Sequence, residues 1–548
     1  MGNKSKNSRN YLVQGSVLVV ASFIARAIGM IYRIPLSNIL GDTGNTYYST
    51  ANEIYSILLM ISTFSLPLAV SRLVAERLHM GQAKNAHKVF VCSVKFAVVA
   101  GGVIAVLTFL LAGPLTKYVM KVESAAMALR VLAPAIFLFA IAGALRGFFQ
   151  GHETMIPTAT SQVIEQIVNA VVSVAGAALL LQVGLRMADS DGGGRGAEFA
   201  AAGGTLGTLV SIAVALVFLM FVYVSYQRTF RRHMRRDTTR RLESDRAIYR
   251  AIILTIVPVV LSTLAYNIGT ILDQAVFNSV LITQGYTSEQ YETIWGIYSG
   301  KYRVMMNVPL SIASCMAPTV VPALTSAMTD GNYREAAGKV RDSIRYTMMI
   351  TIPCAVGLLA LASPIMRLVF GDGRSLTAGL MQHGALLIVL LSLSTLSTGI
   401  LQGLGEVKKP LYHTVFALAV HLVLLYVFLR FPKLNIYGVI YSNTIFALII
   451  CILNALAISR CIPYRQELKR TFILPLLSSG VMGLAAYGVY RLFNLFAGNA
   501  ISTIIAILVG AILYVVLMVK LRGVTESEIS GFPKGTLMVR ILKKCRIL

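Results

Sequence analysis

Charge is scarce in this sequence, and acidic charge is scarcer still. Charged residues make up 13% of the 548 residues, about half of the ~25% that is usual in a soluble domain. Asp and Glu total 23 against 49 Lys and Arg, and 56% of the residues are hydrophobic. So little charge excludes an ordinary soluble domain. It also excludes the nucleic-acid binding that a net charge of +26 would otherwise suggest.

Cysteine is also sparse and unpatterned. The six cysteines form no C-x-x-C pair and show no His/Cys spacing typical of metal ligands. Most of them lie in or beside apolar segments, where Cys packs as a small hydrophobic residue. The sequence therefore predicts no disulfide framework, no metal site and no cofactor.

Long apolar runs dominate what remains. A helix of about 20 apolar residues crosses the ~30 Å hydrocarbon core of a bilayer, and these runs are too long and too uniformly apolar for a barrel strand. We therefore predict an all-α polytopic membrane protein with 14 transmembrane helices. They are expected near 11–32, 51–71, 89–112, 127–146, 157–182, 200–226, 251–281, 294–322, 346–366, 380–403, 411–429, 436–458, 472–491 and 500–519.

The distribution of basic residues predicts the orientation of these helices. If both termini lie inside, 34 of the 49 Lys and Arg fall in cytoplasmic segments, 10 fall outside, and the others lie within or at the edge of helices. Positive charge concentrates on the cytoplasmic side of membrane proteins. The count therefore predicts a multi-pass protein of the cell membrane with cytoplasmic N- and C-termini, and its basic loops are expected to contact anionic lipids.

The two halves of the chain resemble each other. GFFQGHETMIP (147–157) and GILQGLGEVKKP (399–410) share a G-x-x-Q-G core at an offset of 252 residues, and each ends with the proline that opens the next helix. Upstream, residues 64–86 match residues 315–336 in their pattern of proline, apolar helix end, glycine and alanine. Because six crossings separate the copies, they share an orientation and form a parallel repeat, which is typical of alternating-access transporters.

The repeat predicts two pseudo-symmetric six-helix bundles followed by two further helices. The expected parts are an N-terminal bundle (1–227), a basic cytoplasmic linker (228–250), a C-terminal bundle (251–460), and two extra helices with a basic cytoplasmic tail (461–548).

Four of the cations within or beside the predicted helices are candidates for substrate binding. An ionisable group in a spanning helix costs a few kcal/mol, so it is a candidate functional residue. Arg26 and Arg33 lie seven residues apart in the first helix, on nearly the same face, and Lys301 and Arg303 lie near the start of the eighth. Snorkelling explains Arg33, near the outer end, better than the deeper Arg26. A guanidinium group can form two parallel hydrogen bonds to phosphate oxygens. We therefore expect an anionic substrate that carries phosphate or pyrophosphate.

Three acidic residues also fall within the predicted helices. Glu53, Glu165 and Asp273 are candidates either for ion-pair partners of the arginines or for residues that couple transport to a cation or proton.

Three segments resemble a known family. They are IARAIGMIYRIPLSNILG (24–41), the two QG…P segments, and YSGKYRVMMNVPLSIASCMAPTVVPAL (298–324). The chain resembles the MOP (multidrug/oligosaccharidyl-lipid/polysaccharide) flippase superfamily. Within it, the similarity is to the polysaccharide-biosynthesis branch and its lipid II flippase and stage V sporulation protein B-like group.

The resemblance implies a flippase that moves an undecaprenyl-diphosphate-linked glycan, most specifically lipid II for peptidoglycan, by alternating access. It implies that Arg26, Arg33 and Arg303 contact the diphosphate, and that the last two helices form a groove for the polyprenyl tail. The family's lipid II flippases carry a further arginine where this chain has Ser56. We expect a protein that is not an enzyme, binds no nucleic acid and acts as a monomer.

Three alternatives stay open at this stage. A flippase for another lipid-linked oligosaccharide would have the same sequence features. A cation-coupled multidrug antiporter would be expected to have an acid-rich cavity rather than arginines. A membrane-embedded glycosyltransferase or polymerase would need a catalytic constellation in a large loop, and the longest external loops, 183–199 and 282–293, offer only small polar groups.

Overall fold

A computed structural model of the chain is predominantly helical over the residues that it describes, with no strand among them. These residues are 2–62, 65–191, 195–237, 239, 242–524 and 540. Arg240 and Arg241 of the predicted linker and most of the predicted basic tail lie outside the described residues. The expected all-α class is confirmed.

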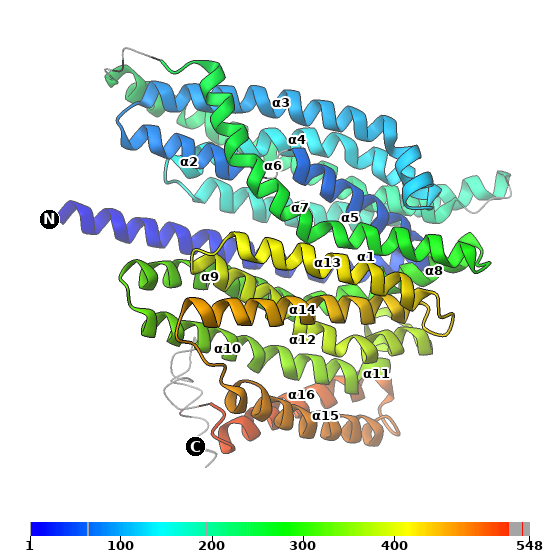
Figure 1. Cartoon of the computed structure of the whole chain (residues 1–548). Helices are drawn as coiled ribbons and strands as arrows, with labels where there is room; N and C mark the ends of the chain where they lie inside the picture. The colour runs from blue at the N-terminus through cyan, green and yellow to red at the C-terminus, as the bar shows by residue number, and fades with distance from the viewer. Residues whose placement is uncertain are drawn as a thin grey trace. The chain divides into compact units, whose positions relative to one another are not determined.

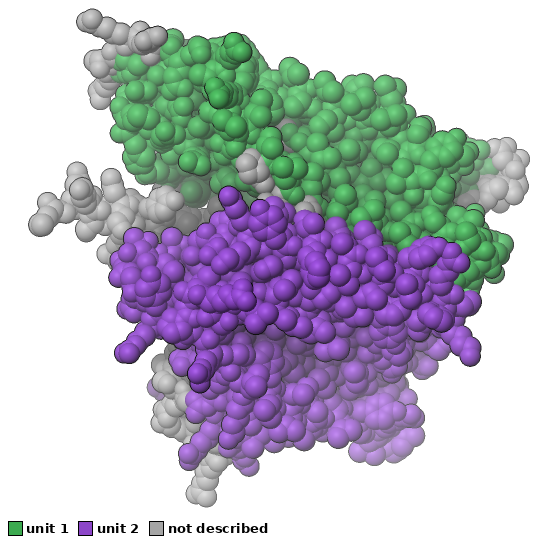
Figure 2. Space-filling model, in the orientation of Figure 1, with its two compact units in different colours: residues 1–300 green, residues 301–548 purple. Residues whose placement is uncertain are grey.

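Contacts divide the chain into two compact units, Met1–Gly300 and Lys301–Leu548 (Figure 2). The division by sequence repeat, within 228–250, stays a prediction. The first unit contains eight named α-helices among its described residues (Figure 1): α1 (Gly2–Ser62), α2 (Leu66–His79), α3 (Ala83–Pro114), α4 (Ala126–Gly151), α5 (Ile156–Asp191), α6 (Gly196–Arg236), α7 (Asp245–Thr283) and α8 (Ser288–Ile297).

The second unit also consists of α-helices. A short π-helical turn, η3 (Tyr298–Tyr302), crosses the division and leads into α9. The helices that follow are α9 (Arg303–Thr329), α10 (Tyr333–Ala360), α11 (Ala362–Phe370), α12 (Ser375–Gly403), α13 (Lys408–Leu429), α14 (Ile436–Cys461), α15 (Leu474–Phe493) and α16 (Gly498–Lys520).

Helices long and apolar enough to cross a membrane account for most of the chain. Among the described residues there are 12 such stretches, and one of them, Ala21–His79, is 59 residues long. At 1.5 Å per residue this stretch would measure about 90 Å, enough for more than one crossing of a ~30 Å core. These elements are consistent with the predicted fourteen spans.

The first two predicted spans meet at a kink rather than in an open loop. Residues 33–50 are helical, and α1 changes direction at Gly41, where φ is 67°. A residue with a side chain rarely adopts this left-handed conformation, so glycine allows the sharp change of direction. The apolar pattern could not reveal this helical segment, because its polar side chains bond partners on α8 and η3.

The repeated G-x-x-Q-G core has the same packing role in each unit. In the first unit, a Cβ on Gly147 would lie 2.7 Å from the Pro67 carbonyl oxygen, so the glycine lets α4 approach α2 closely. In the second, a Cβ on Gly399 would lie 2.8 Å from the Ala317 Cβ, where α12 packs on α9. Small residues allow such close approach of membrane helices.

The last two helices pack on α10 within the second unit. The Tyr514 hydroxyl of α16 donates to the Met349 carbonyl of α10 at 2.7 Å. The buried Arg345 of α10 donates to the Gly523 carbonyl just beyond α16 at 2.7 Å. These two bonds attach α16 and the residues just after it to α10.

Candidate functional site

The predicted arginines of the first helix lie on one stripe of α1. Ser22, Arg26, Gly29 and Arg33 are separated by four, three and four residues, and this spacing places them on one face of an α-helix. This face lies against α5. Ser22 donates to the Gln162 amide oxygen at 3.4 Å, so the stripe runs along a neighbouring polar helix.

The two arginines differ in their surroundings. Arg26 is exposed on the surface of α1, whereas Arg33 is half-buried. The Arg33 guanidinium lies over the Tyr48 ring, 4.9 Å from its centre. Tyr48 follows the kink at Gly41, so the second part of α1 supplies the ring. Such a cation–π contact orients the guanidinium.

Each of the predicted acidic residues has a different setting. Glu165 of α5 pairs with Arg146 of α4 at 2.7 Å, and Arg146 also donates to Ser161 at 3.1 Å. Glu53 lies half-buried on α1, and Asp273 of α7 is 4% exposed. Glu165 is therefore paired with Arg146, which ends the predicted helix 127–146 and was not among the candidate site residues.

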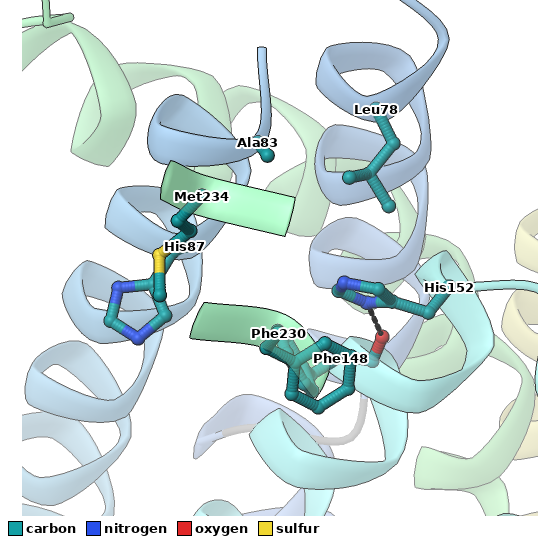
Figure 3. Close-up of a pocket in the computed structure, with 7 residues that line it drawn as sticks. All are labelled: Leu78, Ala83, His87, Phe148, His152, Phe230 and Met234. Carbon is teal, nitrogen blue, oxygen red and sulfur yellow. Dashed lines mark hydrogen bonds between the residues drawn. The ribbon is translucent and has the colours of Figure 1, made fainter. Parts of the chain in front are cut away.

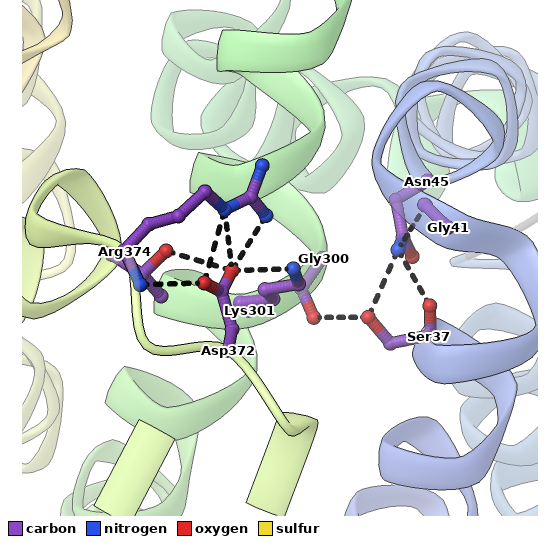
Figure 4. A network of polar contacts seen from close by, with 8 residues as sticks. Ser37, Gly41, Asn45, Gly300, Lys301, Asp372 and Arg374 are labelled. Carbon is purple, nitrogen blue, oxygen red and sulfur yellow. Dashed lines mark hydrogen bonds and ion pairs between the residues drawn. The ribbon is translucent and has the colours of Figure 1, made fainter. Parts of the chain in front are cut away.

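Lys301, one of the candidate cations, is the first residue of the second unit. Lys301 is buried and pairs with Asp372 at 2.7 Å (Figure 4). Asp372 lies between α11 and α12, and it also accepts from the Arg374 backbone and side chain and from Thr377. Burial alone would raise the pKa of the Asp372 carboxyl, but the hydrogen bonds from Arg374 and Lys301 outweigh it and hold this pKa well below its ordinary value.

Arg303 is the first residue of α9 and is half-buried. It follows the π-helical turn that carries Lys301, and such turns are frequent at functional sites. Lys301 and Arg303 thus have distinct environments, although only one residue separates them. That Arg26, Arg33 and Arg303 bind one diphosphate stays a prediction.

A polar contact joins η3, directly after α8, to the kinked part of α1 within the first unit (Figure 4). Ser37 donates to the Gly300 carbonyl at 2.8 Å, and Asn45 donates to the Gly41 carbonyl at 2.6 Å. A Cβ at either Gly296 or Gly300 would overlap α1. The G-x-x-x-G spacing therefore brings two backbones together and allows buried polar side chains to find partners.

A small cavity of about 160 Å³ lies at the ends of four helices of the first unit (Figure 3). An apolar cavity of about this size holds one benzene ring. Its walls are aromatic and aliphatic apart from two imidazoles, and it contains none of the predicted substrate-binding residues. The lining residues are Leu78, Ala83, His87, Phe148, His152, Phe230 and Met234.

Sequence reasoning missed three residues of these clusters. Asp372 lies 71 residues from its partner, in a short G-D-G-R connection whose glycines were the only signal. Arg146 lies at the end of the predicted helix 127–146 and was not among the candidate residues. Gln166 lies on the α5 face that meets α1, and its spacing of four from Gln162 could have indicated a polar stripe.

Comparison with known proteins gives matches over most of the chain. The profile of the family described as "Polysaccharide biosynthesis protein" matches residues 12–328, and the MatE profile matches residues 297–427. The "Lipid II flippase MurJ" of Bacillus subtilis (strain 168) is 26% identical over 532 residues, which covers 92% of this chain and 94% of that protein.

Two solved structures show the same fold. A structure described as "Lipid II flippase MurJ, inward closed conformation" aligns with a TM-score of 0.60 at 14% identity, over 91% of this chain and 97% of that one. An inward-facing multidrug resistance MATE family transporter of the MOP superfamily aligns with a TM-score of 0.61 at 18% identity, over 81% and 98%. The structural alignment therefore covers more of this chain with the MurJ structure than with the MATE structure.

Proposed function

The chain belongs to the polysaccharide biosynthesis protein family, within the MOP superfamily, and on this basis we propose that it is a flippase for a polyprenyl-diphosphate-linked saccharide. The predicted resemblance is thereby confirmed. The relatives described above are flippases and transporters, so the protein is a multi-pass membrane transporter and not a metabolic enzyme. The specific cargo that we propose is lipid II, the cargo named for the Bacillus subtilis relative.

The observation that carries this proposal is the arginine stripe of α1. Arg26 and Arg33 lie on one helical face, within a segment long and apolar enough to span the membrane. A diphosphate is the substrate group that best matches two guanidinium groups, because each can donate two parallel hydrogen bonds to phosphate oxygens. We propose that Arg303 of the second unit completes this site.

The proposed cycle follows alternating access. The diphosphate and its saccharide enter from the inner leaflet while the polyprenyl tail remains in lipid along α15 and α16. Rocking of the two bundles then exposes the headgroup on the outer side. With both termini inside, an inward-negative potential would assist outward movement of the anion by about 2.3 kcal/mol per charge per 100 mV.

The experiment is complementation of a strain depleted of its lipid II flippase. Arg26→Ala should abolish growth and lipid II export while the protein still inserts, because it removes a charged hydrogen-bond donor worth about 1.5–3 kcal/mol. Arg186→Ala is the matched control, because Arg186 is exposed on α5 outside the stripe. Normal growth and normal export with Arg26→Ala would contradict the proposal.

A flippase for another lipid-linked oligosaccharide is the first alternative, and the lipid that accumulates on depletion of the protein distinguishes it. The match of residues 297–427 to the MatE profile favours a second, a cation-coupled multidrug antiporter. An antiporter would export a cationic dye in a sodium- or proton-dependent manner, and Arg26→Ala would not reduce that export.

A further inference from the structure

A stripe of polar residues runs along α5 at membrane depth. Gln162, Gln166, Asn169 and Ser173 are separated by four, three and four residues, so they lie on one face. They fall within Ile156–Met187, one of the stretches able to cross a membrane. Side-chain amides are costly in such a helix unless they find hydrogen-bond partners. Each amide of this stripe therefore needs a hydrogen-bond partner.

The α5 stripe meets the arginine stripe of α1 in matching order. Ser22 contacts Gln162, a Cβ on Gly29 would lie 3.4 Å from the Gln166 amide oxygen, and the Asn169 amide donates to the Tyr32 hydroxyl at 3.2 Å. Positions that increase along α1 pair with positions that increase along α5, so the two helices run parallel.

This register places Arg26 between the two glutamines. Arg26 lies four residues after Ser22 and three before Gly29, so its level on α1 falls between the levels of Gln162 and Gln166 on α5. One helical turn rises about 5.4 Å. The glutamines are therefore within reach of a group attached directly to a phosphate that Arg26 holds.

Gln166 differs from its neighbours on the stripe. Asn169 bonds Tyr32 and Ser173, and Gln162 accepts from Ser22. The amide of Gln166 is half-buried and makes no hydrogen bond to any residue that the structure describes. An amide held at this depth has both donor and acceptor capacity for a ligand with hydroxyl or amide groups.

We propose that Gln166, assisted by Gln162, binds the saccharide that is attached to the diphosphate. This inference rests on the proposed function, because it takes Arg26 as the diphosphate-binding residue. The ligand group is a neutral sugar bearing hydroxyl and amide groups. The glutamines select a glycosylated lipid over the bare polyprenyl diphosphate, whereas the arginines hold the part that both lipids share.

The test measures the affinity of the purified full-length protein for two probes, undecaprenyl diphosphate and lipid II. Gln166→Met keeps the shape of the side chain but removes its hydrogen bonds. It should weaken lipid II binding about 2- to 13-fold, the effect of one neutral hydrogen bond, and leave undecaprenyl diphosphate binding unchanged. Gln182→Met, on the exposed surface of α5, is the matched control and should change neither affinity.

Two results would overturn the assignment: unchanged lipid II binding by Gln166→Met, or equal weakening for both probes. If wild-type protein binds neither probe, the proposed function itself fails. Thermal unfolding of each variant checks that it is folded. Should Gln166→Met not fold, Gln162→Met provides the same comparison, and it should weaken lipid II binding in the same direction and spare the bare lipid.

Discussion

The buried pair of Lys301 and Asp372 allows a quantitative test of the second unit. The side chains of these residues are 9% and 5% exposed, and their charged atoms are 2.7 Å apart. Removing one partner of a buried pair leaves an uncompensated charge and typically costs about 3–5 kcal/mol. We expect Asp372→Leu to destabilise the protein by this amount, because Lys301 would keep its charge in a site that excludes water.

The assay is thermal unfolding of the detergent-purified protein. In a unit of about 250 residues, a loss of 1 kcal/mol lowers the Tm by roughly 2–4 °C, so Asp372→Leu should lower it by about 10 °C. Lys301→Met should cause a similar loss. The double variant, Lys301→Met with Asp372→Leu, should be more stable than the sum of the two single losses predicts. The second substitution removes the buried charge that the first leaves without a partner.

Arg374→Gln provides the control for this cycle. The Arg374 side chain also pairs with Asp372, but it is 46% exposed, and exposed pairs contribute about 0–1 kcal/mol. The reasoning would be refuted if Asp372→Leu left the Tm unchanged, or if the double variant lost as much as both single variants together.

Three further predictions concern pH, helix packing and the linker. Because the folded-state pKa of Asp372 is depressed, its stabilising effect is present above the ordinary pKa of about 4 and is lost as the pH falls through the folded value. The Tm should therefore fall on acidification below about pH 5, and less steeply in Asp372→Asn. Gly203→Leu should reduce the folded yield in gel filtration, because a Cβ there would overlap α5, whereas Gly480→Leu meets open space and should not. Glu243→Gln should speed trypsin cleavage within 237–245, because Glu243 forms two 3.0 Å bonds to the buried Arg77.

The sequence predicted the elements that depend on local pattern. Apolar runs of about 20 residues located the helices, and the 3.6-residue period placed Arg26 and Arg33 on one face. The G-x-x-Q-G repeat marked two positions where helices pack closely. Glycine recurs there because Gly147 and Gly399 each permit a close helix contact.

Contacts between distant segments could not be predicted in the same way. Nothing local links Lys301 to Asp372, because an ion pair across 71 residues depends on how α11 and α12 pack. The helical continuation beyond Arg33 was also missed. Its polar residues resemble a loop in the sequence, but η3 supplies the Gly300 carbonyl for Ser37 and α8 supplies the Glu292 carbonyl for Thr46.

The most direct test of the central claim is translocation of lipid II by the purified protein in proteoliposomes. We predict that wild-type protein and Arg186→Ala move lipid II between leaflets, and that Arg26→Ala reduces the rate at least about 10-fold, as loss of a charged hydrogen bond of ~1.5–3 kcal/mol requires. Equal rates for wild type and Arg26→Ala, or no movement by wild type under a membrane potential of either sign, would contradict the account.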